Sequence, residues 1–381
     1  MRRKGRLIAA MVTAFVVLPL ALGLLFVFQK NGFGQHSGDG EQVKEASTEA
    51  ADAIEETPED EPVTITISAT GDCTFAPTQT HGYAGSFHEY YDRYGERYFM
   101  DGVRDIFAQD SFTLVNLECA LTDVTTYQEK EYVLVGKPSY AGILSSGAIE
   151  GVSLANNHSL DAGTQGLADT KAAVTGAGVT YAYYDEVGVY ETPEHIRIGY
   201  VSSSLLSQGA DREAYLQNGI TQLREMEVDL IIAACHWGEE RTYEPTEYQK
   251  RMAHQCIDWG ADLVIGNHPH VIQGIEEYQG KIICYSLGNF CFGGNSNPSD
   301  KRTFIYQQRF TFVDGQLQPD IDAGIIPCRV SSVSGYNDYQ PTILTGEDKL
   351  SVIKAVRQYS QPISSVTLDD DGNLLVPVTC Q

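Results

Sequence analysis

The sequence predicts an α/β domain in which helices cover buried strands. From about residue 63 onward, short runs of apolar and β-branched residues alternate with longer segments of helical character. Several of the apolar runs stop abruptly at Gly, Asp, Asn or His, as strands do where they leave a sheet. The chain has 381 residues, which is enough for a large core and for two domains at most.

Each expected strand is an apolar run that stops at a turn residue or a polar group. In chain order the strands are 63–69, 112–117, 132–135, 152–155, 196–201, 230–234, 263–265 and 282–287, followed by β-rich structure over 304–330. The segments between them predict helices through 103–107, over 164–175 and 213–224, and from Pro245 to Trp259, since proline suits a first helical turn. This alternation favours strands covered by helices.

The first 62 residues differ from the rest in composition. Basic residues in positions 1–6 precede an apolar run over 7–28, which is long enough, at roughly twenty residues, to cross a bilayer as a helix. We expect a cytoplasmic basic tail and an uncleaved transmembrane signal-anchor, with a cleaved signal peptide as the alternative. Residues 30–62 predict an acidic disordered stalk. The protein is therefore expected in the cell membrane, with a single span and an extracytoplasmic C-terminal domain.

The net charge argues against some classes of binding partner, and the cysteine spacing argues against some classes of metal and redox site. A formal net charge of −25 argues against nucleic acid or another polyanion held by simple electrostatics. None of the eight cysteines forms a CxxC pair, which argues against a zinc ribbon or a thioredoxin site. Cys73, Cys119 and Cys235 are expected in the core. Disulfide bonds between Cys328 and Cys380, or between Cys284 and Cys291, are alternatives that the sequence does not decide.

Five predicted strands end in side chains that can bind a metal. In chain order these are Asp72, Glu118, Asn157 with His158, His236, and His268 with His270. The last pair lies in the stretch ADLVIGNHPHVIQG, where a proline-locked turn follows a short strand. In α/β sheets ligands bind beyond the carboxyl ends of the strands, so these groups are expected to converge. Carboxylate, amide and imidazole together favour one or two divalent ions of Mn, Zn or Fe, and two ions about 3.5 to 4 Å apart can share a bridging carboxylate.

The ordered motifs GDCTF, VNLE, LANNHSLDAG, HWGEE, IGNHPHVIQG and SLGNF resemble the CapA family, which is named for poly-gamma-glutamate capsule biosynthesis. That family is similar to the calcineurin-like metallophosphoesterases, whose fold is a four-layer αββα sandwich. The resemblance covers about residues 63–292. It covers neither the anchor and stalk nor the C-terminal part of the chain. We expect a CapA-like domain over 63–335, followed by a C-terminal extension over 336–381 that packs on the domain.

The same resemblance implies a role for each strand-end residue. It makes Glu118 the bridging carboxylate and His158 the histidine that protonates the leaving group or steadies the transition state. The remaining implied ligands are Asp72, Asn157, His236, His268 and His270. Thr74 stands where phosphoesterases usually carry the histidine of a DxH motif, a departure that CapA-type proteins generally share. One metal position therefore lacks its usual imidazole.

Other polar residues near these motifs are candidates for lesser roles. Lys137, Arg241 and Asn289 could hold substrate, although solvated surface charges and a turn residue are the alternatives. We expect Asn156 to brace its loop and Asp161 to cap the helix that follows.

Two functions of different classes are open from the sequence. The first is a metal-dependent hydrolase of a phosphoester, or of a related ester or amide, in poly-gamma-glutamate or capsule biosynthesis or export. The second is a non-enzymatic accessory or scaffold subunit, with the membrane subunits of a polymer synthase and exporter as partners. A drift to another task in the cell envelope is a third possibility.

Overall fold

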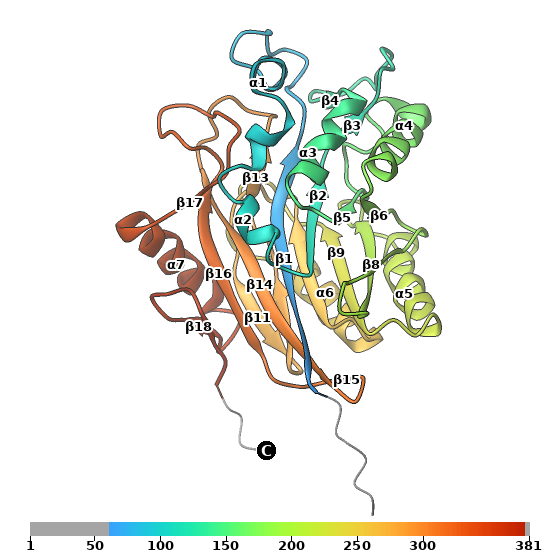
Figure 1. Cartoon of the computed structure of the whole chain (residues 1–381), viewed down its shortest axis with the longest axis vertical. Coiled ribbons are helices and arrows are strands. Elements are labelled where there is room, and N and C mark those ends of the chain that lie inside the picture. Colours follow the sequence, from blue (N-terminus) through green and yellow to red (C-terminus); the bar gives the residue numbers. More distant parts are fainter. Residues whose placement is uncertain (1–60, 378–381) are drawn as a thin grey trace, which may run out of the picture. The chain divides into compact units, whose positions relative to one another are not determined.

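Two β-sheets form the centre of the fold in the computed structural model, which describes residues 61–377 (Figure 1). The larger sheet has nine strands in the described residues and the smaller one has six. The larger sheet runs in the order β17 (Thr342–Ile343), β16 (Asp322–Arg329), β14 (Arg302–Val313), β1 (Val63–Thr74), β2 (Phe112–Leu117), β5 (Gly151–Ser153) and β6 (Thr180–Ala182), with β13 (Asn289–Phe292) beside β1 and β15 (Gln316–Leu317) beside β14. The smaller sheet runs in the order β11 (Ile275–Tyr278), β12 (Lys281–Cys284), β10 (Leu263–Asn267), β9 (Leu230–His236), β8 (Arg197–Ser204) and β7 (Gly188–Glu191).

The two sheets pack face to face on one apolar core. On β1, Ile65, Ile67 and Ala69 alternate with polar residues and therefore share one face of the strand. That face belongs to the same buried cluster as Ile232 of β9 and Leu263 of β10, in the opposite sheet. Burial of this surface on both sides is the main reason that the sheets hold together.

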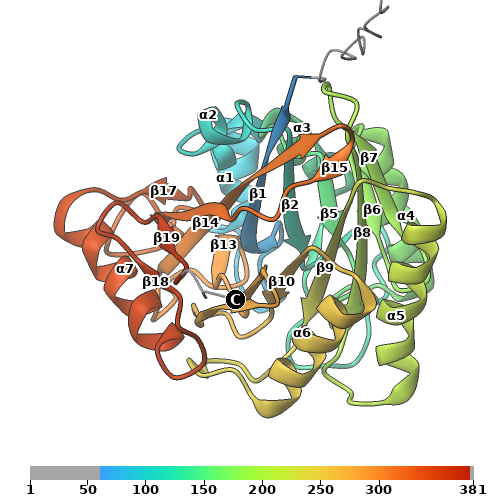
Figure 2. The ribbon, with the colours of Figure 1, turned by 90° about the horizontal axis from the view of Figure 1, so that it is seen from below.

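Helices cover the outer face of each sheet. The nine-stranded sheet carries α1 (Phe87–Tyr94), α2 (Arg104–Phe107), α3 (Gly142–Ser146) and α4 (Gly163–Gly176), while α5 (Ala210–Glu225) and α6 (Glu247–Trp259) cover the six-stranded sheet (Figures 1 and 2). A second core lies under α1 to α4, and a third core lies under α5 and α6. The layers are thus helices, sheet, sheet and helices, in agreement with the predicted sandwich.

The C-terminal segment takes part in both the sheet and the core. Strand β17 extends the nine-stranded sheet, and α7 (Gly346–Ser360) contacts β16 of that sheet and β11 of the other. Val352, Ile353 and Val356 of α7 belong to the core between the sheets. The helix therefore closes one edge of the sandwich, and the small hairpin of β18 (Thr367–Leu368) and β19 (Leu374–Leu375) follows it.

Several element boundaries differ from those expected. The expected strand over 132–135 is reduced to β4 (Val135–Gly136), which pairs with β3 (Ala120–Leu121), because the backbone N–H of Leu134 is taken by the Asp161 carboxylate. Helix α6 begins at Glu247 and not at Pro245, since Thr246 and Gln249 form a capping box at its start. The helix expected through 103–107 has only the four residues of α2.

Further predictions concern the N-terminal segments and the cysteines. The predicted anchor over 7–28 and the stalk over 30–62 lie outside the described residues, and within residues 61–377 no helix is both long and apolar enough to cross a membrane. Cys73, Cys119 and Cys235 are buried in the core, as expected. Cys284 and Cys291 are free thiols, so the suggested bridge between them is wrong. Cys380 lies outside the described residues.

Candidate metal centre

The ends of parallel strands bring the predicted ligands to one place. Asp72 lies near the end of β1, Glu118 directly follows β2, and His236 ends β9. The register pairs Asp72 with Asn116 in one sheet and His236 with Asn267 in the other. The last residues of four strands from two sheets therefore face one another, as the sequence predicted.

Glu118 lies at the centre of this group. Its Oε1 is 3.5 Å from Nε2 of His236 and 3.9 Å from Nε2 of His270. Nδ1 of His270 is in turn 3.1 Å from Oδ2 of Asp72. The side chains of Asp72, Glu118 and His236 are buried, whereas the His270 side chain is 18% exposed.

Buried polar atoms without partners indicate what this group is suited to hold. Both carboxylate oxygens of Glu118, and Nδ1 of His268, are buried and have no hydrogen-bond partner within the described residues. An unpaired buried carboxylate is costly, and native structures avoid it unless an ion or another group completes the site. Three overlapping sets of residues offer ligand atoms, and within each set these atoms lie within 4.8 Å of one another. The sets are Glu118 with His236 and His268, Asp72 with Glu118 and His270, and Glu240 with His268 and His270. The residues therefore fit a metal centre.

Burial and the neighbouring charges shift the pKa values of the cluster residues in different directions. Burial, and then the neighbouring charge of Asp72, raise the pKa of Glu118 well above its usual value. Burial and the nearby His268 hold the pKa of His236 well below its usual range, and burial lowers the pKa of His268 to about 4. For His270, burial lowers the pKa, but the charges of Glu118 and Asp72 outweigh burial and raise it to about 10. Two of the imidazoles are thus neutral, which is the form that binds a metal.

Three asparagines form hydrogen bonds with the other predicted ligands. Nδ2 of Asn116 donates to Oδ1 of Asp72 at 2.8 Å and lies 3.3 Å from Nδ1 of His236. Oδ1 of Asn157 is 2.8 Å from Nε2 of His236, which places this predicted ligand inside the group. Oδ1 of Asn289 is 2.9 Å from Nδ1 of His270, so this candidate for substrate binding holds a histidine.

The predicted proton donor lies beside the cluster with its own partners. Nδ1 of His158 is 2.7 Å from Oδ2 of Asp161, and Nζ of Lys130 is 2.5 Å from Oδ1 of the same carboxylate. Burial lowers the pKa of His158, and the hydrogen bond and charge of Asp161 oppose this change. Asp161 does not cap the following helix as expected, because Ala162 is the N-cap of α4 and the carboxylate is occupied by His158, Lys130 and the backbone of Leu134. Asn156 braces its loop, as predicted, by donating to Leu117 O and accepting from His158 N.

A pocket of about 180 Å³ opens onto these residues. Its lining includes His158, His270, Asn289, Glu240 and Arg241. Lys137 does not belong to the lining: its ammonium pairs with Asp92 at 3.1 Å on an exposed surface. Of the three candidates for substrate binding, the structure thus places Arg241 and Asn289 at the pocket and Lys137 away from it.

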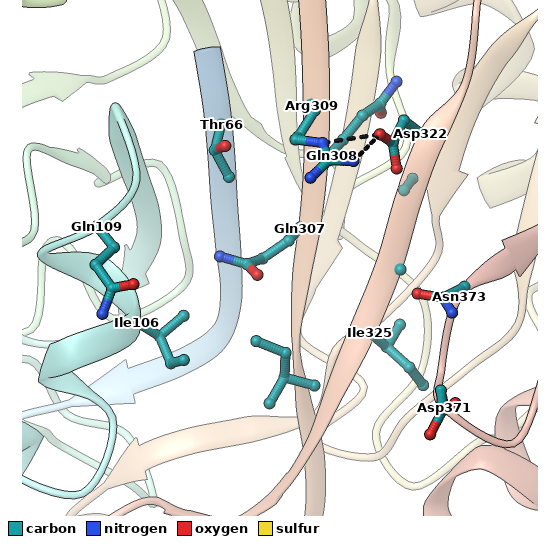
Figure 3. Close-up of a pocket in the computed structure, with 13 residues that line it drawn as sticks. Thr66, Ile106, Gln109, Gln307, Gln308, Arg309, Asp322, Ile325, Asp371 and Asn373 are labelled. Atoms are coloured by element: carbon teal, nitrogen blue, oxygen red, sulfur yellow. Dashed lines mark hydrogen bonds and ion pairs between the residues drawn. The ribbon is translucent and has the colours of Figure 1, made fainter. Parts of the chain in front are cut away.

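A larger hollow of about 400 Å³ lies on the outer face of the nine-stranded sheet, between α2 and the β18–β19 hairpin (Figure 3). Its lining includes the amide side chains of Gln307 and Asn373, and two of its charged side chains, Arg309 and Asp322, pair with each other. None of the predicted ligands lines this hollow. We therefore place the site in the smaller pocket, at the strand ends.

The backbone is strained where the ligands are presented. His268 has φ of 99° and His270 has φ of 57°, on either side of Pro269, and Arg241 has φ of 61°. Residues with a side chain rarely adopt positive φ. Arg241 is held there by a 2.8 Å hydrogen bond from its N–H to the carbonyl of Pro269. Strain of this kind is common at functional sites.

Three residues of the site were not identified from the sequence. Asn116 lies two positions before Glu118 on β2, so strand alternation places both on one face, and this signal was available. Glu240 is the second glutamate of HWGEE and offers a carboxylate in a histidine motif. Lys130 lies in a long connection between strands, where sequence gives no sign of contact with His158.

Comparison with known proteins shows the family to which this chain belongs. A model of the family described as "Bacterial capsule synthesis protein PGA_cap" matches residues 66–197 and 183–294, which together are more than half of the chain. A Bacillus anthracis protein, "Capsule biosynthesis protein CapA", is 29% identical over 58% of this chain and 60% of its own length. A Bacillus subtilis (strain 168) protein, "PGA biosynthesis protein CapA", is 29% identical over 50% of this chain and 55% of its own length. A Mycobacterium tuberculosis (strain H37Rv) protein, named a "probable polyglutamine synthesis accessory protein", is 27% identical over 57% of this chain and 66% of its own length. The chain thus spans somewhat more than half the length of the two Bacillus relatives that it matches.

Proposed function

Because the chain belongs to the PGA_cap family of bacterial capsule synthesis proteins, we propose that it serves the biosynthesis or export of poly-gamma-glutamate or a related capsule polymer through a metal-dependent hydrolytic site. The names of the relatives, which refer to capsule, PGA and polyglutamine synthesis, support the proposed class of polymer. The observation that carries the hydrolytic site is the buried cluster around Glu118, whose carboxylate oxygens have no partner in the described part of the chain. Mixed carboxylate and imidazole donors suit Mn²⁺, Zn²⁺ or Fe²⁺.

The residues that would hold the metal are those that the strand ends bring together. Glu118 lies close to both His236 and His270, so it would contribute a carboxylate to the donor sets of both histidines. The other ligands are Asp72, Asn157, His236, His268 and His270. When bound, a divalent ion acidifies water and polarises a phosphoryl, ester or amide oxygen.

His158 is the proposed proton donor. Its Nδ1 is hydrogen-bonded to Asp161, which leaves Nε2 for a leaving group in the pocket that His158 lines. The Asp161 charge raises the pKa of His158 against the lowering by burial and so favours the protonated imidazole that a general acid requires. Lys130, close to the other oxygen of Asp161, keeps this carboxylate in place.

Arg241 is the proposed anchor for an anionic substrate. Its side chain is exposed, it lines the pocket next to His270, and its backbone is tied to the histidine turn. A guanidinium binds carboxylate and phosphate in a planar, bidentate manner. The anchor therefore suits either a phosphoester or the free carboxylate of a glutamyl chain.

The proposal is tested by metal analysis of the full-length protein, purified in detergent. We expect at least one equivalent of a transition metal in the wild type and its loss in the double variant His268→Ala, His270→Ala. The matched control is His81→Ala, His195→Ala, which removes two histidines that do not line the pocket. A screen of phosphoesters and γ-glutamyl amides follows. A folded wild type without metal, or hydrolysis unchanged in the double variant, contradicts the proposal.

A specific observation favours a second function, that of a non-enzymatic accessory or scaffold subunit. Thr74 replaces the histidine that phosphoesterases usually supply, and one relative bears the name of an accessory protein. In this function, membrane subunits of a polymer synthase and exporter are the partners. Expression of the His268→Ala, His270→Ala variant in a strain lacking this chain separates the two: full rescue of the polymer favours the scaffold, and failure with normal protein levels favours the hydrolase.

We also propose that the protein is a single-pass membrane protein with its C-terminal domain outside the cytoplasm. The support is the apolar run over 7–28 behind a basic N-terminus. Protease added to intact protoplasts is expected to digest the domain and leave a short membrane-bound fragment. Full protection of the domain contradicts this topology.

A further inference from the structure

Glu240 lies close to two of the histidines in the cluster, although it belongs to none of the strand ends. One carboxylate oxygen of Glu240 and one nitrogen each of His268 and His270 lie within 4.8 Å of one another. Glu240 follows β9 in an exposed turn and lines the same pocket as His158 and His270. We propose that Glu240 is a further metal ligand, which completes the coordination of one ion from the solvent side of the pocket.

The position that Glu240 would complete is one donor short. Asp72, Glu118 and His270 form a set of three donors, whereas a closed metal site commonly has four or more. Thr74 gives no imidazole here, and its hydroxyl is buried and unpaired within residues 61–377. Glu240 shares His270 with this set, so an ion held there by His270 would have the Glu240 carboxylate as a further donor.

An independent observation points to an absent ligand at the same place. His268 is only 6% exposed, and its Nδ1 has no hydrogen-bond partner in the part of the chain that the structure describes. His268 is the residue that the Glu240 set shares with the set of Glu118 and His236. An ion bound at His268 would satisfy its Nδ1 and neutralise the unpaired carboxylate of Glu118, which shares a donor set with His268.

The donor types imply that the two positions differ in metal preference. The position completed by Glu240 offers that carboxylate with the imidazoles of His268 and His270, and His270 also belongs to the set of the two carboxylates Asp72 and Glu118. The other set, His236 and His268 with Glu118, has a single carboxylate and is therefore richer in nitrogen than the donors around His270 taken together. Oxygen-rich sites favour Mn²⁺, whereas imidazole suits Zn²⁺ and Fe²⁺. This inference rests on the proposed metal centre and adds to it a distinct, Mn²⁺-preferring position that depends on Glu240.

The test compares two adjacent glutamates that differ only in their place relative to the cluster. Full-length protein is stripped with a chelator and titrated separately with Mn²⁺ and Zn²⁺ by calorimetry, for the wild type, Glu240→Gln and Glu239→Gln. Both glutamates are exposed, so neither change threatens the fold, and circular dichroism verifies this. We expect Glu240→Gln to weaken one Mn²⁺ site by at least about tenfold, while Glu239→Gln leaves it unchanged.

Three other outcomes overturn different claims. If the wild type binds Mn²⁺ and Glu240→Gln binds it with the same stoichiometry and affinity, the role of Glu240 is wrong while the metal centre stands. If the wild type binds neither metal, the metal centre itself fails. An equal loss in Glu239→Gln and Glu240→Gln also overturns the inference, because general negative charge would then explain the effect.

Discussion

Asp72 and Asn116 lie side by side on adjacent parallel strands, and the Asn116 amide donates a 2.8 Å hydrogen bond to Oδ1 of Asp72. The same amide nitrogen is 3.3 Å from Nδ1 of His236, which belongs to the opposite sheet. One buried amide therefore contacts a carboxylate of the nine-stranded sheet and an imidazole of the six-stranded sheet. This arrangement fixes the relative positions of ligands that come from both layers.

Replacing Asn116 by Ala is expected to weaken metal binding by about 10- to 100-fold, as the loss of outer partners of metal ligands commonly does. Asp72 would lose the donor that orients it. The measurement is a competition titration with a chromophoric chelator. The control, Thr113→Ala on the same strand, removes a buried hydroxyl that bonds Asp110 outside the cluster. If both variants reduce affinity equally, general loosening of β2 is the cause and the role given to Asn116 is wrong.

The strand-end ligands could be predicted because two independent patterns agree there. Apolar runs mark β2, β9 and β10, and the residues that stop each run are ligand types. Parallel strands then bring their carboxyl ends together without further information. The same reasoning could not give the pocket lining, since Arg241 and Glu240 are placed by a turn with positive φ and by a hydrogen bond to Pro269.

Asp161→Asn is expected to separate proton donation from metal binding. The carboxylate raises the pKa of His158 through its charge and hydrogen bond, so its neutralisation leaves the imidazole less protonated. For any substrate that the screen identifies, we expect kcat to fall by about 10²-fold, with metal content and KM unchanged. In the pH profile of kcat, the loss of activity caused by deprotonation of His158 should move to lower pH. A fall in metal content together with activity would show that Asp161 acts only on the structure of the site.

Asp161 also shows where reasoning from sequence is limited. An acidic residue shortly before a helix suggests a cap, because capping is local. In the structure the carboxylate instead meets Lys130 and Leu134, which lie about thirty residues earlier in the chain. Contacts across such loops depend on tertiary packing, which no short pattern encodes. The short β4 is another example, since Leu134 gives its N–H to Asp161 and not to a neighbouring strand.

Gly71→Ala is expected to destabilise the fold strongly. A Cβ at this position would lie 1.9 Å from the carbonyl oxygen of Gly288, in the close crossing where the N–H of Asp72 donates to that same carbonyl. Backbone must move to relieve the clash, at a cost of about 2 to 4 kcal/mol of unfolding free energy. Urea denaturation measures it. Gly176→Ala in α4 is the control, because among the described residues no atom other than those of its chain neighbours and its own helix backbone lies within 4 Å of its added Cβ. A midpoint equal to that of the control contradicts the close approach.

Glu150 makes the stability of the domain depend on pH. It lies just before β5, and one of its carboxylate oxygens accepts a 2.8 Å hydrogen bond from the N–H of Thr113. Burial raises its pKa from 4.5 to about 7, and Asp110 adds to this effect. The folded state therefore binds this proton more tightly than the unfolded state does. Stability contributed by the protonated carboxyl is present below about pH 4.5 and is lost as pH rises to about 7.

Glu150→Gln is expected to remove this dependence, because a neutral amide keeps the acceptor for Thr113 and carries no charge to bury. At pH 8 the variant should be more stable than the wild type by about 1 to 3 kcal/mol, and at pH 5 the difference should fall below about 1 kcal/mol. Urea midpoints at the two pH values measure this. Glu225→Gln, on the exposed face of α5, should change neither value. If Glu150→Gln gives the same difference at both pH values, the carboxyl does not titrate between them and its pKa is not raised by burial.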